Sequence, residues 1–199
     1  MRLKLPYIDT GAMYRALTLE AMRLHIPFQN IPELVKLSKK IRIRFGPMRV
    51  FNQKVYLNGR DVTKAIRTPE LTQNVVFVAR EPRLRREMVK KQRALGKKGG
   101  AVMEGRDIGS VVFPKADYKF FFDASVEIRA RRRYRELLAE GKKPSLARVA
   151  REIKLRDSSD RNRKAGALRV AKGARVLDTT SLTIPATVDK ILAILRERS

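Results

Sequence analysis

The sequence predicts an α/β fold built on a parallel sheet. Four short apolar segments have the composition of buried strands, at residues 7–8, 101–103, 118–122 and 174–177. Three of them run directly into an aspartate, and the second runs into the charged sequence EGRD at residues 104–107. Segments with helical periodicity separate the four strands. This alternation is typical of a parallel sheet whose strands are connected by helices.

Length and composition restrict the class of protein. The 199 residues fit one domain, and a hydrophobic share of 43% is enough for a sizeable core. The absence of cysteine excludes disulfides and thiolate metal sites and suits a reducing compartment. The single histidine, His25, is expected at a helix end or in packing, which excludes histidine triads and histidine-rich metal sites. No run approaches the ~20 apolar residues of a membrane span, and no signal peptide is visible.

The chain is strongly basic. It has 46 lysines and arginines against 20 acidic residues, which gives a formal net charge of +26. Such a charge predicts affinity for polyanions, a class that includes nucleic acids, acidic membranes and phosphorylated small molecules. Because the basic residues are spread along the chain, we expect much of the excess on a solvated surface, and the charge alone does not choose the ligand.

The first predicted strand passes directly into a helix. Residues 9–11 (DTG) form the junction, Thr10 is the expected N-cap, and Tyr14 and Arg15 follow in the first helical turn. A helix N-terminus beside an arginine favours phosphate binding. A surface arginine on an ordinary helix explains the same residues equally well.

Residues 41–57 interrupt the helix-and-strand pattern. The predicted order is strand 41–45, turn 46–47, strand 49–51, turn 52–53 and strand 54–57. Alternating polarity with closely spaced turns predicts a small antiparallel β insertion. Helices then begin at residues 68–70 (TPE) and 81–82 (EP). The second has a predicted apolar stripe, flanked by Arg85, that consists of Leu84, Met88 and Gln92.

Residues 105–107 (GRD) follow the predicted strand at 101–103. In open α/β sheets, ligands bind beyond the carboxyl ends of the strands. Arg106 and Asp107 are therefore candidates for a shared ligand site. A surface ion pair beside a turn glycine is the alternative.

The C-terminal half contains an arginine-rich helix, capped by Ser125, and a second helix capped by Ser145. The predicted buried stripe of the second helix consists of Leu146, Val149 and Ile153. The same stepping then reaches Arg156, Asp160 and Arg163. Charges on an inward face need partners or a ligand, unless the helix has left the core by residue 156. A last helix at about 184–196 is expected to bury Val188, Ile191, Leu192 and Leu195.

Three segments together resemble bacterial cytidylate kinase. They are residues 7–15 (YIDTGAMYR), 105–114 (GRDIGSVVFP) and 156–163 (RDSSDRNR). The β insertion also resembles that family's nucleoside-monophosphate-binding insert, and the resemblance covers essentially the whole chain. It implies a P-loop NTPase-like nucleoside monophosphate kinase fold, with one kinase domain over residues 1–199. Within it the resemblance implies a nucleoside-monophosphate-binding region at about 30–98 and a lid-like region at about 131–163.

The resemblance implies transfer of the terminal phosphoryl group of ATP to CMP or dCMP, with Mg²⁺. Arg15 and Arg106 resemble the family's contacts to the phosphate of the acceptor nucleotide. Arg85 and Asp107 resemble its contacts to the base. Arg156 and Asp160 resemble the family's ribose contacts, and Arg163 resembles a residue close to the acceptor nucleotide. The resemblance also places Thr10 and Tyr14 in the lining of the same pocket. Forked guanidinium groups suit a phosphate dianion, and an acid with an arginine suits cytosine. Arg131, Arg132 and Arg133 are expected to supply positive charge around the moving phosphoryl group. Arg106 is expected to share this catalytic role.

One departure from the family is large. The family begins with a strand, a loop of the form G-x-x-x-x-G-K-S/T and a helix, and no such loop occurs in this sequence. The family's strand is central, so its removal is expected to leave a gap of about 9.6 Å between its neighbours. Unpaired backbone groups in such a gap each cost ~1–3 kcal/mol, which is large against a total stability of ~5–15 kcal/mol. We therefore expect the true start about 25 residues upstream.

Three interpretations stay open. The first is a CMP/dCMP kinase, expected to be a cytoplasmic monomer without a membrane partner, a specific nucleic acid or a metal site of its own. The second is a non-catalytic CMP-binding fragment. The third is a basic RNA-binding protein, suggested by the charge but disfavoured because the aromatic residues 120–122 are expected to be buried. Non-specific polyanion binding is compatible with all three.

Overall fold

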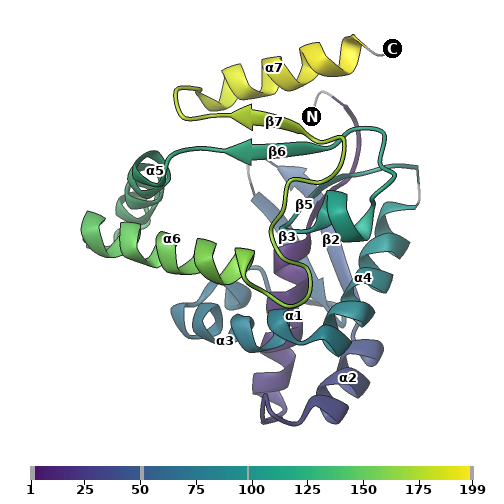
Figure 1. Ribbon diagram of the computed structural model, residues 1–199. Helices are drawn as coiled ribbons and strands as arrows, with labels where there is room; N and C mark the ends of the chain where they lie inside the picture. The colour runs from purple at the N-terminus through teal and green to yellow at the C-terminus, as the bar shows by residue number, and fades with distance from the viewer. Residues whose placement is uncertain (1–2, 50–51, 98, 198–199) are drawn as a thin grey trace. The chain divides into compact units, whose positions relative to one another are not determined.

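The computed structural model describes residues 3–49, 52–97 and 99–197, and the chain divides into two compact units. Unit 1 comprises Met1–Phe113 and Lys164–Gly166. Unit 2 comprises Pro114–Arg163 and Ala167–Ser199. Both units mix helices with parallel strands, as the α/β prediction requires (Figure 1).

Unit 1 combines a parallel strand pair with an antiparallel meander. Its strands are β1 (Tyr7–Asp9), β2 (Ile43–Arg49), β3 (Asn52–Leu57), β4 (Arg60–Asp61) and β5 (Val102–Glu104). Its longer helices are α1 (Thr10–Arg23), α2 (Ile31–Lys40), α3 (Pro69–Arg80) and α4 (Pro82–Gly96). Short 3₁₀ and π-helical turns occur at Ala65–Arg67 and Ile108–Val112. β1 pairs in parallel with β5, whereas β2, β3 and β4 are antiparallel in that order.

The core of unit 1 forms around α1. Met13, Ala16 and Leu17 are fully buried there, and α4 adds Leu84 and Met88 from the predicted stripe. Because β1 leads into α1 without a loop, burial of this helix fixes the carboxyl end of β1 in place. The site residues of α1 therefore start from a rigid support.

The insertion is antiparallel as predicted, but its internal boundaries differ. Gly46 and Pro47 do not turn the chain; they lie inside β2, where the register with β3 shifts between Phe45 and Met48. A β-bulge accommodates the extra residues, so a Gly-Pro pair continues the strand. The predicted turn at 52–53 is likewise wrong, since both residues belong to β3. Residues 50–51 of the candidate strand at 49–51 lie outside the described residues.

Unit 2 contains β6 (Phe120–Asp123) and β7 (Arg175–Asp178), which pair in parallel. Its helices are α5 (Val126–Ala139), α6 (Leu146–Arg161) and α7 (Ile184–Arg196). The predicted caps at Ser125 and Ser145 are confirmed, because each side chain accepts a hydrogen bond from the first helical turn. An ion pair of 2.7 Å between Arg129 and Asp157 joins α5 to α6.

The predicted parallel sheet is found as two separate ladders, β1–β5 and β6–β7. A two-stranded ladder covers its faces poorly, and several residues predicted to be buried are exposed. Phe120 and Phe121 are half-buried and Phe122 is 54% exposed, so full burial of the aromatic run, and the argument drawn from it, is wrong. Leu146 and Val188 are also exposed at their helix starts, and α7 buries Ile194 instead.

Within the described part of the chain, no helix is long and apolar enough to cross a bilayer.

Candidate functional site

The candidate site of unit 1 is built where two parallel strands end. Asp9 of β1 and Glu104 of β5 are partners in the strand register, so the residues that follow both strands start from the same edge. Arg106 and Asp107 come directly after β5, and α1 comes directly after β1. This is the edge at which open α/β sheets bind ligands.

Arg85 and Asp107 form a buried ion pair at this edge. Each side chain is only 6% exposed, and the Arg85 Nη2 atom donates to Oδ2 of Asp107. Arg85 also donates from Nη1 to the carbonyl of Ala79 at 2.8 Å, and its Cζ lies 5.3 Å from the Tyr14 ring centroid. A buried charge is tolerated when it is paired and hydrogen-bonded, which this environment provides. The sequence placed Arg85 beside the apolar stripe of α4, and the structure buries it with that stripe.

The first residues of α1 link the two strand ends. Asp9, not Thr10, is the N-cap, because its Oδ1 atom accepts from the Ala12 amide at 3.0 Å. Thr10 is the first helical residue, and its hydroxyl instead donates to the Glu104 carbonyl at 2.7 Å. The predicted N-cap is therefore wrong by one residue, and the Thr10 hydroxyl becomes a cross-link between α1 and β5.

Gly105 permits this cross-link. A Cβ atom at that position would lie 2.3 Å from the Thr10 hydroxyl oxygen and 2.8 Å from Cδ1 of Ile108. Any side chain there would force apart the junctions after β1 and β5. The glycine of the GRD segment thus has a packing role beside its charged neighbours.

Arg15 and Arg106 are the arginines predicted to hold a phosphate. Arg15 Nη1 donates to the Thr72 hydroxyl at 2.8 Å and to the Ile66 carbonyl at 3.2 Å, which anchors it to the start of α3. Arg106 is exposed, and its charge acts on Glu104. Arg15 is therefore tied to the start of α3, and the Arg106 side chain is exposed at the end of β5.

Glu104 and Tyr7 form a coupled pair along the strands. Although Glu104 keeps exposed surface, the atoms packed around its carboxylate hinder hydration and raise its pKa, and the charge of Asp9 raises it further. A hydrogen bond from Tyr7 and the charge of Arg106 act in the opposite direction. Burial, followed by the charge and hydrogen bond of Glu104, raises the pKa of Tyr7 far above its ordinary value. Tyr7 therefore remains a neutral hydrogen-bond donor at any physiological pH.

In unit 2, the charged continuation of the α6 stripe is present. Asp160 accepts from Arg163, with side-chain exposures of 13% and 11%. The Arg156 Nε atom lies 3.9 Å from the other Asp160 oxygen but is 61% exposed. The predicted inward face thus continues on α6 only to Asp160. Arg156 has reached solvent, and Arg163 lies beyond the end of α6 at Arg161, from where it turns back to Asp160. Within the described residues, Nε of Arg163 is buried and has no hydrogen-bond acceptor.

The three arginines predicted together on α5 have different surroundings. Arg132 is half-buried and donates to the carbonyls of Thr179 and Leu182, the latter at 3.1 Å, so it supports the loop after β7. Arg133 pairs with Glu136 of its own helix at 2.8 Å. Arg131 is exposed and makes no side-chain ion pair or hydrogen bond with the described residues. Side-chain contacts thus separate residues that the sequence pattern could not distinguish.

Some partners of the site residues left no signal in the sequence. Arg85 and Arg132 are held by backbone carbonyls, and carbonyls carry no residue-type signature. Thr72, which anchors Arg15, lies one turn after the Thr68 cap, and its hydroxyl also bonds the Thr68 carbonyl.

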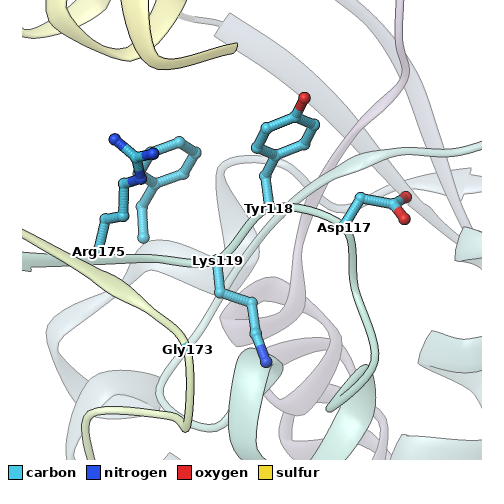
Figure 2. A pocket seen from close by; sticks show the side chains of 6 residues that line it. Asp117, Tyr118, Lys119, Gly173 and Arg175 are labelled. Carbon is cyan, nitrogen blue, oxygen red and sulfur yellow. The ribbon is translucent and has the colours of Figure 1, made fainter. Parts of the chain in front are cut away.

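A small polar pocket lies in unit 2 at the amino-terminal end of the β6–β7 ladder, where both strands begin (Figure 2). It is lined by Asp117, Tyr118, Lys119, Phe120, Gly173 and Arg175. Its cations already have partners: Lys119 donates to the Pro114 carbonyl at 2.9 Å, and Arg175 pairs with Glu197 at 3.3 Å. None of the predicted site residues lines this pocket. The described residues also contain no group of three His, Cys, Asp or Glu side chains suited to a metal ion.

Comparison with known proteins gives one family. The family model described as cytidylate kinase matches residues 1–197. The cytidylate kinase of Geobacillus sp. (strain WCH70) is 46% identical over 197 residues, which cover 99% of this chain and 88% of the relative. The cytidylate kinase of Bacillus subtilis (strain 168) is 45% identical over 193 residues, with 97% and 86% covered. The cytidylate kinase of Exiguobacterium sibiricum is 48% identical over 191 residues, with 96% and 83% covered.

Proposed function

The chain belongs to the cytidylate kinase family, and we propose that it transfers the terminal phosphoryl group of ATP to CMP or dCMP, giving CDP or dCDP. The observation that carries this proposal is the buried Arg85–Asp107 pair beyond the carboxyl end of β5. Burying a charged pair adds little stability compared with apolar side chains of similar volume, so its presence here supports a role in recognition. Its donor and acceptor atoms are those that a cytosine base requires.

Asp107 and Arg85 read the base. Cytosine has an exocyclic amino group that donates to a carboxylate, and it has acceptors that match a guanidinium. Uracil has a carbonyl oxygen in place of the amino group, which would face the Asp107 carboxylate. The pair therefore favours CMP and dCMP over UMP. Tyr14, whose ring lies beside Arg85, belongs to the same acceptor site in this proposal.

Arg15 and Arg106 bind the acceptor phosphate. Guanidinium groups bind a phosphate dianion through paired, charge-assisted hydrogen bonds. Arg15, held by Thr72, binds one side of the phosphate, and the exposed Arg106 binds it from the end of β5. Thr10, at the first position of α1, supports the same edge of unit 1.

The remaining contacts in this proposal follow the family resemblance of residues 156–163. Arg156 and Asp160 bind the ribose hydroxyls, and Arg163 contacts the acceptor nucleotide. Arg131 is the α5 arginine best suited to the transferring phosphoryl group, because Arg132 and Arg133 already hold protein groups. We assign residues of about 30–98 to the nucleoside-monophosphate-binding region and about 131–163 to a lid.

Mg²⁺ enters the reaction with ATP. In nucleotide sites this ion takes one or two carboxylates together with phosphate oxygens and waters, and it neutralises charge on the phosphates. Asp9 and Glu104, at partnered strand ends, fit that donor set. The sequence contains no G-x-x-x-x-G-K-S/T loop for the ATP phosphates. The second candidate function is CMP binding without phosphoryl transfer, which the buried Arg85–Asp107 pair supports equally.

Two measurements test the proposal. Calorimetric titration at fixed salt is expected to show tighter binding of CMP than of UMP or AMP. Phosphoryl transfer from ATP to CMP is then measured for this chain and for a form extended upstream through any in-frame glycine-rich loop. Transfer identifies a kinase, whereas selective CMP binding without transfer by either form identifies the second candidate. Equal binding of all three nucleotides overturns both.

A salt titration separates these functions from RNA binding. The net charge of +26 and the exposed Phe122 are the observations that favour RNA. Binding through phosphate contacts weakens steeply as salt rises, and the slope grows with the number of phosphates neutralised. A steep slope for RNA combined with no nucleotide selectivity would replace the kinase proposal. A cytoplasmic location and a monomeric state complete the proposal, and light scattering tests the latter.

A further inference from the structure

The Arg85–Asp107 pair has a further contact that the sequence did not indicate. The backbone of Gly166 lies directly against the Arg85 guanidinium, and Lys164–Gly166 belong to unit 1 although the chain on both sides belongs to unit 2. We propose that Gly166 is a positioning residue for base recognition, which holds Arg85 in register with Asp107. This inference rests on the proposed function, because it assumes that the pair reads cytosine.

The space at Gly166 admits no side chain. A Cβ atom there would lie 2.1 Å from Nη2, 2.3 Å from Cζ and 2.4 Å from Nε of Arg85. Contacts this short do not occur in real structures, so either the guanidinium or the segment would have to move. Gly166 also has a φ of +64°, in the left-handed region that glycine adopts without strain.

The nearest atom shows what would be disturbed. Nη2 is the nitrogen that donates to Asp107, so a side chain at position 166 presses on the very bond that joins the pair. The other partners of Arg85 fix it from elsewhere: Ala79 accepts from Nη1, and Tyr14 faces the guanidinium. A displaced guanidinium therefore cannot keep its bonds to both Ala79 and Asp107. Loss of this geometry weakens the interaction that distinguishes cytosine from uracil.

The contact also assigns a role to residues Lys164–Gly166, which follow α6. Gly166 follows Arg163 by three residues, and Arg163 lies just beyond α6 and pairs with Asp160 of that helix. The short connection Lys164–Gly166 thus supplies backbone to the base-reading pair of unit 1. Its role is to limit the movement of Arg85, not to contact the nucleotide.

The test compares Gly166→Ala with Gly173→Ala. Gly173 has a φ of +74°, and a Cβ there would meet only the end of Lys119 at 3.8 Å, so it shares the backbone cost without a clash. Calorimetric titration with CMP and UMP is carried out on the wild type and both variants. We expect Gly166→Ala to weaken CMP binding about tenfold or more, comparable with losing one hydrogen bond to a charged group. UMP binding should change less, so the preference for CMP falls, and Gly173→Ala should match the wild type.

A double-mutant cycle separates positioning from a general structural effect. In an Arg85→Lys background the planar fork is absent, so Gly166→Ala should cause little further loss of CMP affinity. Additive losses, or a Gly166→Ala variant that keeps wild-type CMP selectivity, overturn the inference while leaving the proposed function in place. Failure of the wild type to bind CMP at all overturns the proposed function, and the assigned role of Gly166 with it.

Discussion

The two units hold their key arginines in different ways. In unit 1, Arg85 is buried and fixed by a carboxylate, a carbonyl and an aromatic ring before any ligand arrives. In unit 2, Arg156 is largely exposed and lies 3.9 Å from Asp160, and Arg131 is exposed on α5. A group that discriminates between bases gains from rigid support, because a small displacement costs selectivity. A group that supplies charge to a moving phosphoryl group needs reach. Under the proposed function, Arg85 has the fixed support that base discrimination requires, whereas Arg131 and Arg156 are exposed; Arg163, paired with Asp160, is buried more like Arg85.

The largest expected effect comes from breaking the buried pair. Asp107→Asn leaves the Arg85 guanidinium buried without a counter-charge, which typically costs ~3–5 kcal/mol. We expect the free energy of unfolding to fall by about this amount, together with loss of selective CMP binding. Urea unfolding and calorimetric titration measure the two effects. Where the single variant is too unstable to study, Arg85→Met combined with Asp107→Leu should recover stability but not CMP binding.

The matched change in unit 2 is Asp160→Asn. Asp160 is shared by the 11% exposed Arg163 and the 61% exposed Arg156, so its loss leaves one arginine that is nearly buried and one that water reaches, and we expect a smaller loss of about 1–3 kcal/mol. If Asp160→Asn destabilises the protein as strongly as Asp107→Asn, the contrast between the buried Arg85 and the exposed Arg156 does not hold.

An intermediate effect is expected within the arginines of α5. Arg132→Ala removes the donor to the Thr179 and Leu182 carbonyls, which should lower stability by ~1–3 kcal/mol. Arg131→Ala should leave the unfolding free energy within about 0.5 kcal/mol of the wild type, because it removes an exposed side chain. In a form that transfers phosphoryl groups, Arg131→Ala should lower kcat with little change in KM for CMP. If Arg132→Ala lowers kcat while the free energy of unfolding stays unchanged, Arg131 and Arg132 share the catalytic role and the distinction between them is wrong.

Most elements of the fold were predictable because their signals are local. Helix caps at Thr68 and Ser125, and the strand ends at Asp9 and Asp123, follow from a few adjacent residues. The errors arose where distant parts of the chain decide the outcome. Gly46 continues β2 because β3 pairs with it through a bulge.

The candidate site shows the same limit. Asp107 and Arg85 are 22 positions apart, and motif resemblance indicated both, but their burial as a direct pair required the fold. The apolar run containing Phe122 predicted burial, which depends on neighbours that a two-stranded ladder does not supply. Likewise, the different surroundings of Arg131 and Arg132 follow from which one faces the β7–α7 loop.

The smallest expected effect is on the pH dependence of stability. It concerns two carboxylates, Glu104 in unit 1, whose pKa is raised, and Glu127 in unit 2, whose pKa is lowered. Incomplete hydration and the charge of Asp9 raise the pKa of Glu104, so the folded state binds more protons than the unfolded state between the ordinary and the raised pKa. Stability therefore falls as pH rises through that interval. Glu104→Gln keeps an acceptor for Tyr7 and avoids this loss. It should stabilise the protein at neutral pH by less than about 1 kcal/mol, since the carboxylate is partly exposed, and the gain should vanish at acidic pH.

Glu127, in the first turn of α5, is the matched control with the opposite sign. Its own backbone amide and Ser125 lower the pKa of its carboxyl, so its contribution is present above the ordinary pKa and is lost as pH falls through the lowered value. Glu127→Gln should therefore destabilise the protein slightly at neutral pH, where Glu104→Gln stabilises it. Thermal unfolding of both variants from acidic to neutral pH measures the difference. Changes of the same sign at neutral pH would show that net charge, not local environment, governs both carboxylates in this basic chain.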